Sequence, residues 1–282
     1  MAIQFPVNVY YNGIDPAISI IVLNFNRASL TRKCLKHLWK HTTGGHFEIL
    51  VVDNGSSVED LRHLAEAPGP FTLLQLGSNR YFGEGNNIGA AHSRGRHIVF
   101  LNNDAFVTKG WLEPLITVLE HRPNAGGVGP RFIYPDGRLQ EAGAFVDEDG
   151  YSIQVGNSDI HDVADQFRER IVDYCSAACL AVTREAFELV GGFDPVYEPA
   201  YYEDADLCFK IGSLGKHIFY CPYSTVVHIK NATSFETWDR LAIQNIIERN
   251  RRIFLSRWGG WLRKRARTIG RAPELPNCSF GD

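Results

Sequence analysis

Apolar and polar positions follow two repeating patterns in the first half of the chain. Short runs rich in β-branched residues predict strands that are buried on both faces of a sheet. They cover residues 18–26, 47–53, 71–76 and 97–101. Segments with apolar residues at helical spacing predict helices between and after these strands. They cover residues 29–41, 58–66, 86–95 and 110–121. This alternation, with short connections, predicts an α/β fold in which helices flank a mostly parallel, open sheet.

The second half of the chain has a less regular pattern. The expected elements are a hairpin or loop insertion at 139–156, a strand at 170–183, a helix at 201–215, two strands within 216–229 and a long amphipathic helix at 237–258. The Gly/Pro cluster at 191–195 predicts a turn. After Arg271 the composition is rich in Pro, Gly and Asn, which predicts a disordered tail.

Polar residues follow each predicted strand of the first half. Ligands of open α/β sheets bind beyond the carboxyl ends of the strands. The strand-end groups are 24–26, 53–57, 77–87 and 102–104. One such group could be a plain turn, but four at one rim indicate a polar cleft. The first strand is followed by neither GxGxxG nor GxxxxGK[ST], so those loops would not hold a nucleotide.

Two acidic residues near the start of the predicted helix at 201–215 occupy different faces. The buried stripe of this helix is marked by Leu207, Ile211 and Leu214. Asp204 precedes this stripe by one turn and lies on the same face. Asp206 lies on another face, four residues before Lys210, and we expect a solvated ion pair there. The periodicity therefore selects Asp204 as the acid that faces the cleft. The alternative is that Glu203 and Asp204 only cap the helix.

Composition narrows the class of protein. The 282 residues are 44% hydrophobic and 22% charged, with a net charge of −3, so charge does not suggest a nucleic-acid partner. No apolar run is long enough to span a bilayer, and no secretory signal is visible. The six cysteines form no CxxC pair, and we expect them to be reduced, mostly core residues of a cytoplasmic protein. Sequons at Asn231 and Asn277 are short enough to arise by chance.

Seven segments, in this order and spacing, resemble the inverting nucleotide-sugar transferases of glycosyltransferase family 2, which have the GT-A fold. They are ISIIVLNFNR, EILVVDNGSS, NRYFGEGNNIG, FLNNDAFVTKGWL, GGFDPVY, YYEDADLCFKIGSLG and VVHIKNATS. The rhamnosyltransferase-like branch, which builds bacterial surface polysaccharides, is the most similar. The resemblance implies a GT-A catalytic domain at 17–235 after a lead-in at 1–16. A C-terminal amphipathic and basic helical extension at 236–271 and a disordered tail at 272–282 would follow.

The resemblance also implies which residues bind the donor nucleotide. They would be Asn24, Phe25, Asp53, Arg80, Asn86 and Asn103. The ring of Phe25 would stack on the base, and Asp53 would hydrogen-bond the base or the ribose. The residues themselves leave other interpretations open: Phe25 could be plain core packing, and Asp53 could accept a hydrogen bond within an Asx turn.

For the metal and the chemistry, the resemblance implies a second set of residues. Mn²⁺ or Mg²⁺ would bind Asp104 and His228 and bridge the donor diphosphate, and Asp204 would deprotonate the acceptor hydroxyl. The acceptor or sugar side would be lined by Trp111, Phe193 and Glu203. A histidine at a strand end can equally be a hydrogen-bonded structural residue, and Trp111 can be core. The family usually has two carboxylates where this chain has Asn102-Asn103-Asp104, so we expect weak metal binding without donor.

These implications describe a metal-dependent inverting glycosyltransferase. It would move a sugar, rhamnose if the branch holds, from a dTDP- or UDP-linked donor to a bacterial surface glycan or a lipid-linked acceptor. Two alternatives are a sugar-phosphate nucleotidyltransferase and a catalytically inactive sugar-nucleotide-binding module. From Arg249 to Arg271 there are nine Arg and Lys and no Asp or Glu. The helix at 237–258 would pack on the catalytic domain, while 257–271 could contact anionic lipid at the inner face of the cell membrane.

Overall fold

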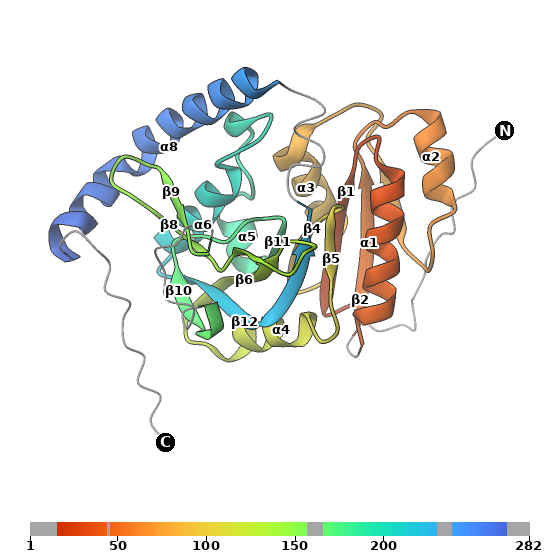
Figure 1. Cartoon of the computed structure of the whole chain (residues 1–282), viewed down its shortest axis with the longest axis horizontal. Coiled ribbons are helices and arrows are strands. Elements are labelled where there is room, and N and C mark those ends of the chain that lie inside the picture. The colour runs from red at the N-terminus through yellow and green to blue at the C-terminus, as the bar shows by residue number, and fades with distance from the viewer. Residues whose placement is uncertain (1–15, 44–45, 157–165, 230–238, 270–282) are drawn as a thin grey trace.

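The first half of the protein forms the expected strand–helix units. A computed structural model describes residues 16–43, 46–156, 166–229 and 239–269 (Figure 1). The elements of the first half are β1 (Ile18–Asn24), α1 (Ala28–His41), β2 (Phe47–Asp53), α2 (Val58–Ala65), β3 (Thr72–Gln75), α3 (Tyr81–His92), β4 (His97–Asn102), β5 (Ala105–Val107) and α4 (Leu112–His121). All four strands expected here are present. A helix directly follows β1, β2 and β3, and the short strand β5 lies between β4 and α4 in the chain.

The second half adds further strands and the helices that carry the acidic residues. Its elements are β6 (Ala125–Ile133), β7 (Leu139–Glu141), β8 (Ala144–Val146), β9 (Ser152–Gln154), β10 (Arg170–Val172), β11 (Cys179–Thr183), α5 (Arg184–Leu189), the 3-10 helix η2 (Pro195–Tyr197), α6 (Glu203–Ser213), β12 (His217–His228) and α8 (Arg240–Ile269). The expected hairpin is the antiparallel pair β8–β9.

One large mixed sheet runs through the described residues, in the order β10-β12-β6-β11-β4-β1-β2-β3, with β5 on β12 and β7 on β6. The pairs β1–β2, β1–β4 and β2–β3 are parallel, so the carboxyl ends of these strands meet at one rim. β11 is antiparallel to β4, and the second half of the sheet has both directions. The parallel character expected from the sequence therefore belongs to the first four strands.

Helices cover both faces of the sheet, as the doubly buried strands require. Successive side chains of a strand point to opposite faces, and β1 shows this clearly. Ile20 and Val22 join one core cluster together with Leu35 of α1 and Leu115 of α4. Ile21 joins the other cluster, which is covered by α3, α5, α6 and α8. Figure 1 shows α8 at the end of the molecule away from α1 and α2.

Four expectations about elements were wrong. The strand expected at 170–183 is two strands, and the two strands expected within 216–229 are one, β12, with a register shift between Cys221 and Thr225. The helix expected at 86–95 spans 81–92 instead. Its glycines have a packing role that the sequence pattern did not show: a Cβ on Gly85 would lie 2.7 Å from Leu23 Cδ1 of β1. Leu214, placed on the buried stripe, is 42% exposed.

β6 was not anticipated, because its Gly and Pro content argues against a strand. The glycines have a packing role instead: a Cβ on Gly129 would lie 2.3 Å from Cys175 Cβ. α8 also continues beyond the expected end at 258. The five described cysteines are free and buried, as expected.

Several expectations fall outside the described residues. They concern the lead-in at 1–15, the two sequons, Cys278, and the segments 236–238 and 270–282.

Candidate active site

A chain of buried side-chain hydrogen bonds joins the carboxyl ends of the parallel strands. Asn24, fully buried at the end of β1, donates through Nδ2 to Asp53 Oδ1 at 3.0 Å and to Asp60 Oδ2 at 2.9 Å. Its Oδ1 accepts from Thr31 Oγ1 at 2.6 Å, and that hydroxyl accepts from Asn103 Nδ2 at 3.1 Å. The side-chain amide of Asn24 is therefore hydrogen-bonded to the side chains of Asp53, Asp60 and Thr31 at this rim.

Asp53 is the acceptor of the turn that follows β2. Its Oδ2 accepts from the backbone N–H of Ser56 at 3.1 Å, and the residue is 1% exposed. This contact between Asp53 and Ser56 agrees with the Asx-turn interpretation. Asp60, which was not among the expected residues, also accepts from the Ala28 N–H at 2.8 Å and so fixes the start of α1. A sequence signal existed for it, since Ser57 followed three residues later by an acidic residue indicates a helix start.

The other expected nucleotide residues lie around the same rim. Phe25 is half-buried. The guanidinium of Arg80 is half exposed and 3.6 Å from Glu84, and its backbone N–H donates to Asn54 Oδ1. Asn86 is buried on α3 and donates to its own helix, at Phe82 O. Of this group, the guanidinium of Arg80 is the side-chain cation available to an anionic ligand.

Asp104 and His228 are brought together by the pairing of β5 with β12. Ala105 of β5 lies opposite His228, which places Asp104 beside the imidazole. The His228 Nε2 and Asp104 Oδ1 atoms are 3.3 Å apart, and both residues are buried. A sequence separation of more than a hundred residues is thus closed by one strand pair.

Gln140, which the sequence analysis missed, determines the tautomer of His228. Gln140 Nε2 donates to His228 O at 2.9 Å, so the amide oxygen faces Nδ1 and must accept from it, at 2.7 Å. A neutral imidazole that donates from Nδ1 presents a lone pair at Nε2. Nε2 faces the Asp104 carboxylate, and in the neutral form of the imidazole the two atoms could share a cation. Within the described ranges, no group of three or more His, Cys, Asp or Glu is arranged to hold a metal.

Glu203 and Asp204 start α6 in a desolvated position. Asp204 accepts from the backbone N–H groups of Ala177 at 3.3 Å and Ala205 at 2.8 Å. Burial raises the pKa of the Asp204 carboxyl above its ordinary value. Burial and then the charge of Asp204 raise the pKa of Glu203 well above its ordinary value. The Oε2 atom of Glu203 is buried without a hydrogen-bond partner among the described residues.

The short strand β7 connects the Asp104–His228 pair to these carboxyls. Gln140 binds His228, as above, and the next residue, Glu141, accepts from the Ser176 N–H at 3.0 Å. The residue after Ser176, Ala177, donates to Asp204. Two pairs of neighbouring residues, 140–141 and 176–177, therefore link the contacts of the His228 imidazole to those of Asp204. The arrangement can bind a cation and take up a proton in one neighbourhood.

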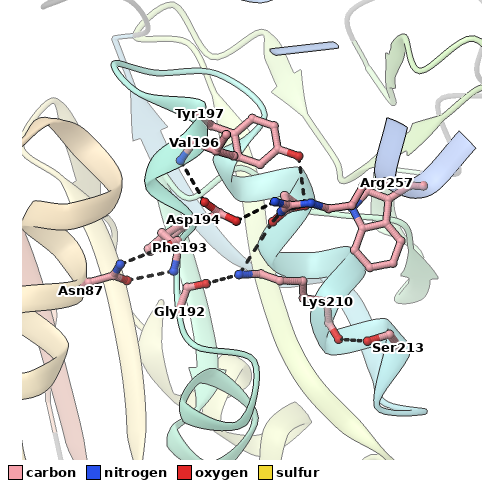
Figure 2. A network of polar contacts seen from close by, with 11 residues as sticks. Asn87, Gly192, Phe193, Asp194, Val196, Tyr197, Lys210, Ser213 and Arg257 are labelled. Atoms are coloured by element: carbon pink, nitrogen blue, oxygen red, sulfur yellow. Dashed lines mark hydrogen bonds and ion pairs between the residues drawn. The ribbon is translucent and has the colours of Figure 1, made fainter. Parts of the chain in front are cut away.

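Asp206 pairs with Lys210 as expected, but the pair is not solvated. The carboxylate is fully buried, and Arg257 Nη1 donates to both of its oxygens at 3.0 and 3.1 Å. Trp258 Nε1 and the Tyr197 hydroxyl donate to Oδ1 at 2.8 and 3.1 Å. Lys210 is 3.7 Å away. Figure 2 shows Arg257 of α8 directed at Asp194 and Lys210 bonded to Gly192.

Two residues expected on the acceptor side are core residues. Trp111 is fully buried, and its Nε1 donates to Thr42 Oγ1 at 3.1 Å. Phe193 is 1% exposed and packs edge-on against Phe100, with ring centroids 4.9 Å apart. The burial of Trp111 agrees with the core interpretation left open for it, and Phe193 is part of an aromatic cluster in the core.

Known proteins with similar sequences include bacterial enzymes of glycan biosynthesis. The chain is 28% identical over 240 residues to the O-antigen biosynthesis protein RfbC of Myxococcus xanthus, covering 82% of this chain and 18% of RfbC. It is 28% identical over 245 residues to an N-acetylglucosaminyl-diphospho-decaprenol L-rhamnosyltransferase of Mycobacterium tuberculosis, covering 76% of each. RfbC and a further curated relative are much longer, and the chain spans 18% and 25% of their lengths.

The fold is that of solved GT-A structures. A crystal structure of GalNAc-T7 with UDP, GalNAc and Mn²⁺ aligns with a TM-score of 0.63 at 17% identity, over 79% of this chain and 47% of GalNAc-T7. The family model described as "Glycosyl transferase family 2" matches residues 19–191, more than half of the chain. The protein therefore belongs to glycosyl transferase family 2.

Proposed function

We propose that the protein is a metal-dependent, inverting glycosyltransferase with Asp204 as its catalytic base. One observation carries the proposal: β7 brings the contacts of the Asp104–His228 pair next to those of Asp204. A structural role for these residues alone would not require a half-buried carboxyl with a raised pKa whose contacts adjoin those of an imidazole paired with a carboxylate.

Asp104 Oδ1 and His228 Nε2 would hold Mn²⁺ or Mg²⁺, together with the donor diphosphate. When bound, the ion neutralises charge on the departing nucleoside diphosphate. The imidazole ligand favours Mn²⁺, and the Mn²⁺ in the GalNAc-T7 structure supports a divalent ion in this fold. Because the protein supplies one carboxylate here, the ion should bind weakly until donor is present.

Asp204 would accept the proton of the acceptor hydroxyl as that oxygen attacks the anomeric carbon. The bond from the acceptor oxygen to this carbon forms while the bond to the diphosphate oxygen breaks. The raised pKa of Asp204 suits this role, because a base is most effective when its pKa approaches the working pH. The backbone N–H groups of Ala177 and Ala205 keep the carboxylate oriented.

The donor would be a dTDP- or UDP-linked sugar. Similarity to the mycobacterial rhamnosyltransferase supports rhamnose and a lipid-linked acceptor, and similarity to RfbC supports a bacterial surface glycan. Family membership argues against a nucleotidyltransferase. The presence of Asp104, Asp204 and His228 argues against an inactive binding module.

A panel of nucleotide sugars tests this function. Each is added with and without Mn²⁺, and the thermal unfolding midpoint is measured, since a ligand that binds only the folded state raises it. We expect one base and sugar to give the largest Mn²⁺-dependent rise, and the same donor to support sugar transfer. A protein that is stabilised by no nucleotide sugar would contradict the proposal.

We also propose that α8 contacts an anionic membrane surface, through a smaller part of 257–271 than the sequence indicated. Arg257 and Arg265 bind Asp194 and Asp173 and are unavailable. Trp261 is 51% exposed, and Arg263, two residues further along α8, is exposed too. No described helix is long and apolar enough to cross a bilayer. A Trp261→Ala, Arg263→Glu variant should sediment less with anionic vesicles than the parent, and equal sedimentation would contradict this contact.

The buried free thiols support a further part of the proposed function, namely that the protein acts in a reducing, cytoplasmic compartment.

A further inference from the structure

The residues just before the acidic pair form a turn with an uncommon backbone. Tyr201 and Tyr202 have φ of 74° and 72°, in the left-handed region that bulky side chains rarely adopt. Such a conformation costs on the order of 1–3 kcal/mol per residue and persists only where surrounding contacts impose it. Tyr202 is directly followed by Glu203 and Asp204, the first residues of α6. The direction of both carboxyls therefore depends on what holds this turn.

The side-chain amide of Asn250, on α8, binds backbone carbonyl groups of this turn. The residue is fully buried, and its Nδ2 lies 2.7 Å from Tyr197 O, 2.9 Å from Ala200 O and 2.8 Å from Tyr201 O. Three carbonyl groups of one turn thus converge on a single amide, whose two hydrogens they share. A turn carbonyl left unpaired in a buried place costs about 1–3 kcal/mol, so the amide strongly favours this backbone conformation.

Arg249 completes the contact from the neighbouring position. Its Nε donates to Asn250 Oδ1 at 2.9 Å, which fixes the orientation of the amide. Its Nη2 donates to Val196 O at 3.3 Å and also to Glu198 O. One helical turn further on, Phe254 packs against the ring of Tyr202, with centroids 5.5 Å apart. α8 therefore contacts the turn through hydrogen bonds to five carbonyls and through one aromatic pair.

We propose that Asn250, assisted by Arg249, is a positioning residue that sets the geometry of Glu203 and Asp204. It contacts no reacting atom and acts through the turn at 197–202. Both residues lie outside the segment that the family model matches. The proposal rests on the role proposed above for Asp204, and it makes α8 part of the active site.

Asn250→Leu tests the proposal, because leucine has a similar volume and no donor. The full chain is assayed with the donor selected by the nucleotide-sugar panel, by release of nucleoside diphosphate. We expect kcat to fall about tenfold to hundredfold, as a misplaced base causes, while the donor KM stays within about twofold. The acid limb of the pH–kcat profile should shift, and amide hydrogen exchange of 197–206 should become faster.

Leu262→Ala is the matched control. Leu262 is 1% exposed on the same helix, three turns beyond Asn250, so its loss lowers stability without touching the turn. Its kcat and pH profile should match the parent below its unfolding temperature. If Asn250→Leu behaves as this control does, the proposal is wrong.

Arg249→Met is a second variant, which tests the proposal even if Asn250→Leu does not fold. Arg249 is exposed, so the variant should fold, and we expect kcat to fall about threefold to tenfold with the same shift of the acid limb. Unchanged values overturn the proposal if Asn250→Leu does not fold. Full activity of Asp204→Asn, in contrast, overturns the proposed base, and faster exchange at 197–206 in Asn250→Leu would then still show that α8 holds the turn.

Discussion

Asp204 and Asp206 lie two residues apart on α6, and their surroundings are opposite in kind. Asp206 is fully buried and receives hydrogen bonds from Arg257, Trp258 and Tyr197. Among the residues that the structure describes, Asp204 receives two backbone N–H groups and no side-chain cation, and its neighbour Glu203 has an unpartnered oxygen. One carboxylate is saturated by the protein, and the other keeps capacity for a proton.

This contrast separates structural carboxylates from chemical ones. A buried charge is tolerated when cations and donors neutralise it, and it then contributes to the arrangement of the helices around it. A buried carboxyl without a cation has a raised pKa and can exchange a proton near neutral pH. Sequence neighbours can therefore have separate roles, according to which other elements reach them.

The first test of the contrast is Asp204→Asn, for which we expect the largest effect. The amide keeps the size of the side chain and cannot take up the acceptor proton, so kcat should fall on the order of 10²- to 10⁴-fold. Donor binding, measured by calorimetry with Mn²⁺, should stay unchanged. Activity close to that of the parent would show that the carboxyl is not the base.

Asp206→Asn should act on stability. It removes one of the two carboxylates that pair with Arg257, the other being Asp194. Because the Arg257 side chain is 36% exposed and keeps Asp194, the loss should be about 1–2 kcal/mol of unfolding free energy, less than for a fully buried pair. Urea unfolding measures this difference. Asp136→Asn is the control, since Asp136 forms an exposed pair with Arg138 and should give no measurable change. Equal stability of the two variants would remove the distinction between Asp206 and a surface acid.

Gln140→Leu extends the contrast to His228. Without the amide, the imidazole loses the acceptor that keeps its proton on Nδ1. We expect the affinity for Mn²⁺, measured by calorimetry with nucleoside diphosphate present, to fall about 10- to 100-fold. Gln75→Leu, at an exposed glutamine of β3, should leave it unchanged. A wild-type affinity in Gln140→Leu would argue that His228 is not a ligand.

Glu203→Gln should give the smallest effect, seen as a change of stability with pH. The folded protein raises the pKa of Glu203, so the folded state binds this proton more tightly than the unfolded state. The stability gained is complete below the unfolded pKa of about 4.3 and is lost as pH rises towards the folded pKa. In this window, the parent should lose about 1 kcal/mol per pH unit relative to Glu203→Gln in urea unfolding. Parallel pH curves would contradict this.

The first half of the fold was predictable because its strands and helices carry their own local patterns. β1, β2 and β4 are apolar runs rich in β-branched residues, and the structure finds them as buried parallel neighbours. β6 escaped prediction because its glycines are selected by neighbours such as Cys175, which lie far along the chain. Local propensity describes only the part of packing that a segment contains itself.

The same limit applies to the candidate site. The face of Asp204 followed from helical periodicity, but the surroundings of Asp206 did not, because Arg257 and Trp258 reach it from about fifty residues away. An acid four residues before a lysine has the pattern of a surface pair. Gln140 and Asn250 had no sequence signal, since an isolated amide has no periodic pattern. Their roles depend on contacts that β7 and α8 make with segments far away in the sequence.

The pairing of Asp206 with Arg257 also bears on when the protein matures during its synthesis. Chains emerge from the ribosome amino end first, at about 5–20 residues per second. Asp206 is made several seconds before Arg257, which is 51 residues later. In that interval the parallel strands can assemble. The Asp206 carboxylate still lacks the cation of Arg257, and α6 still lacks its packing contacts with α8. A nascent chain could thus complete the rim of β1, β2 and β4 before the acidic end of α6 has its final environment.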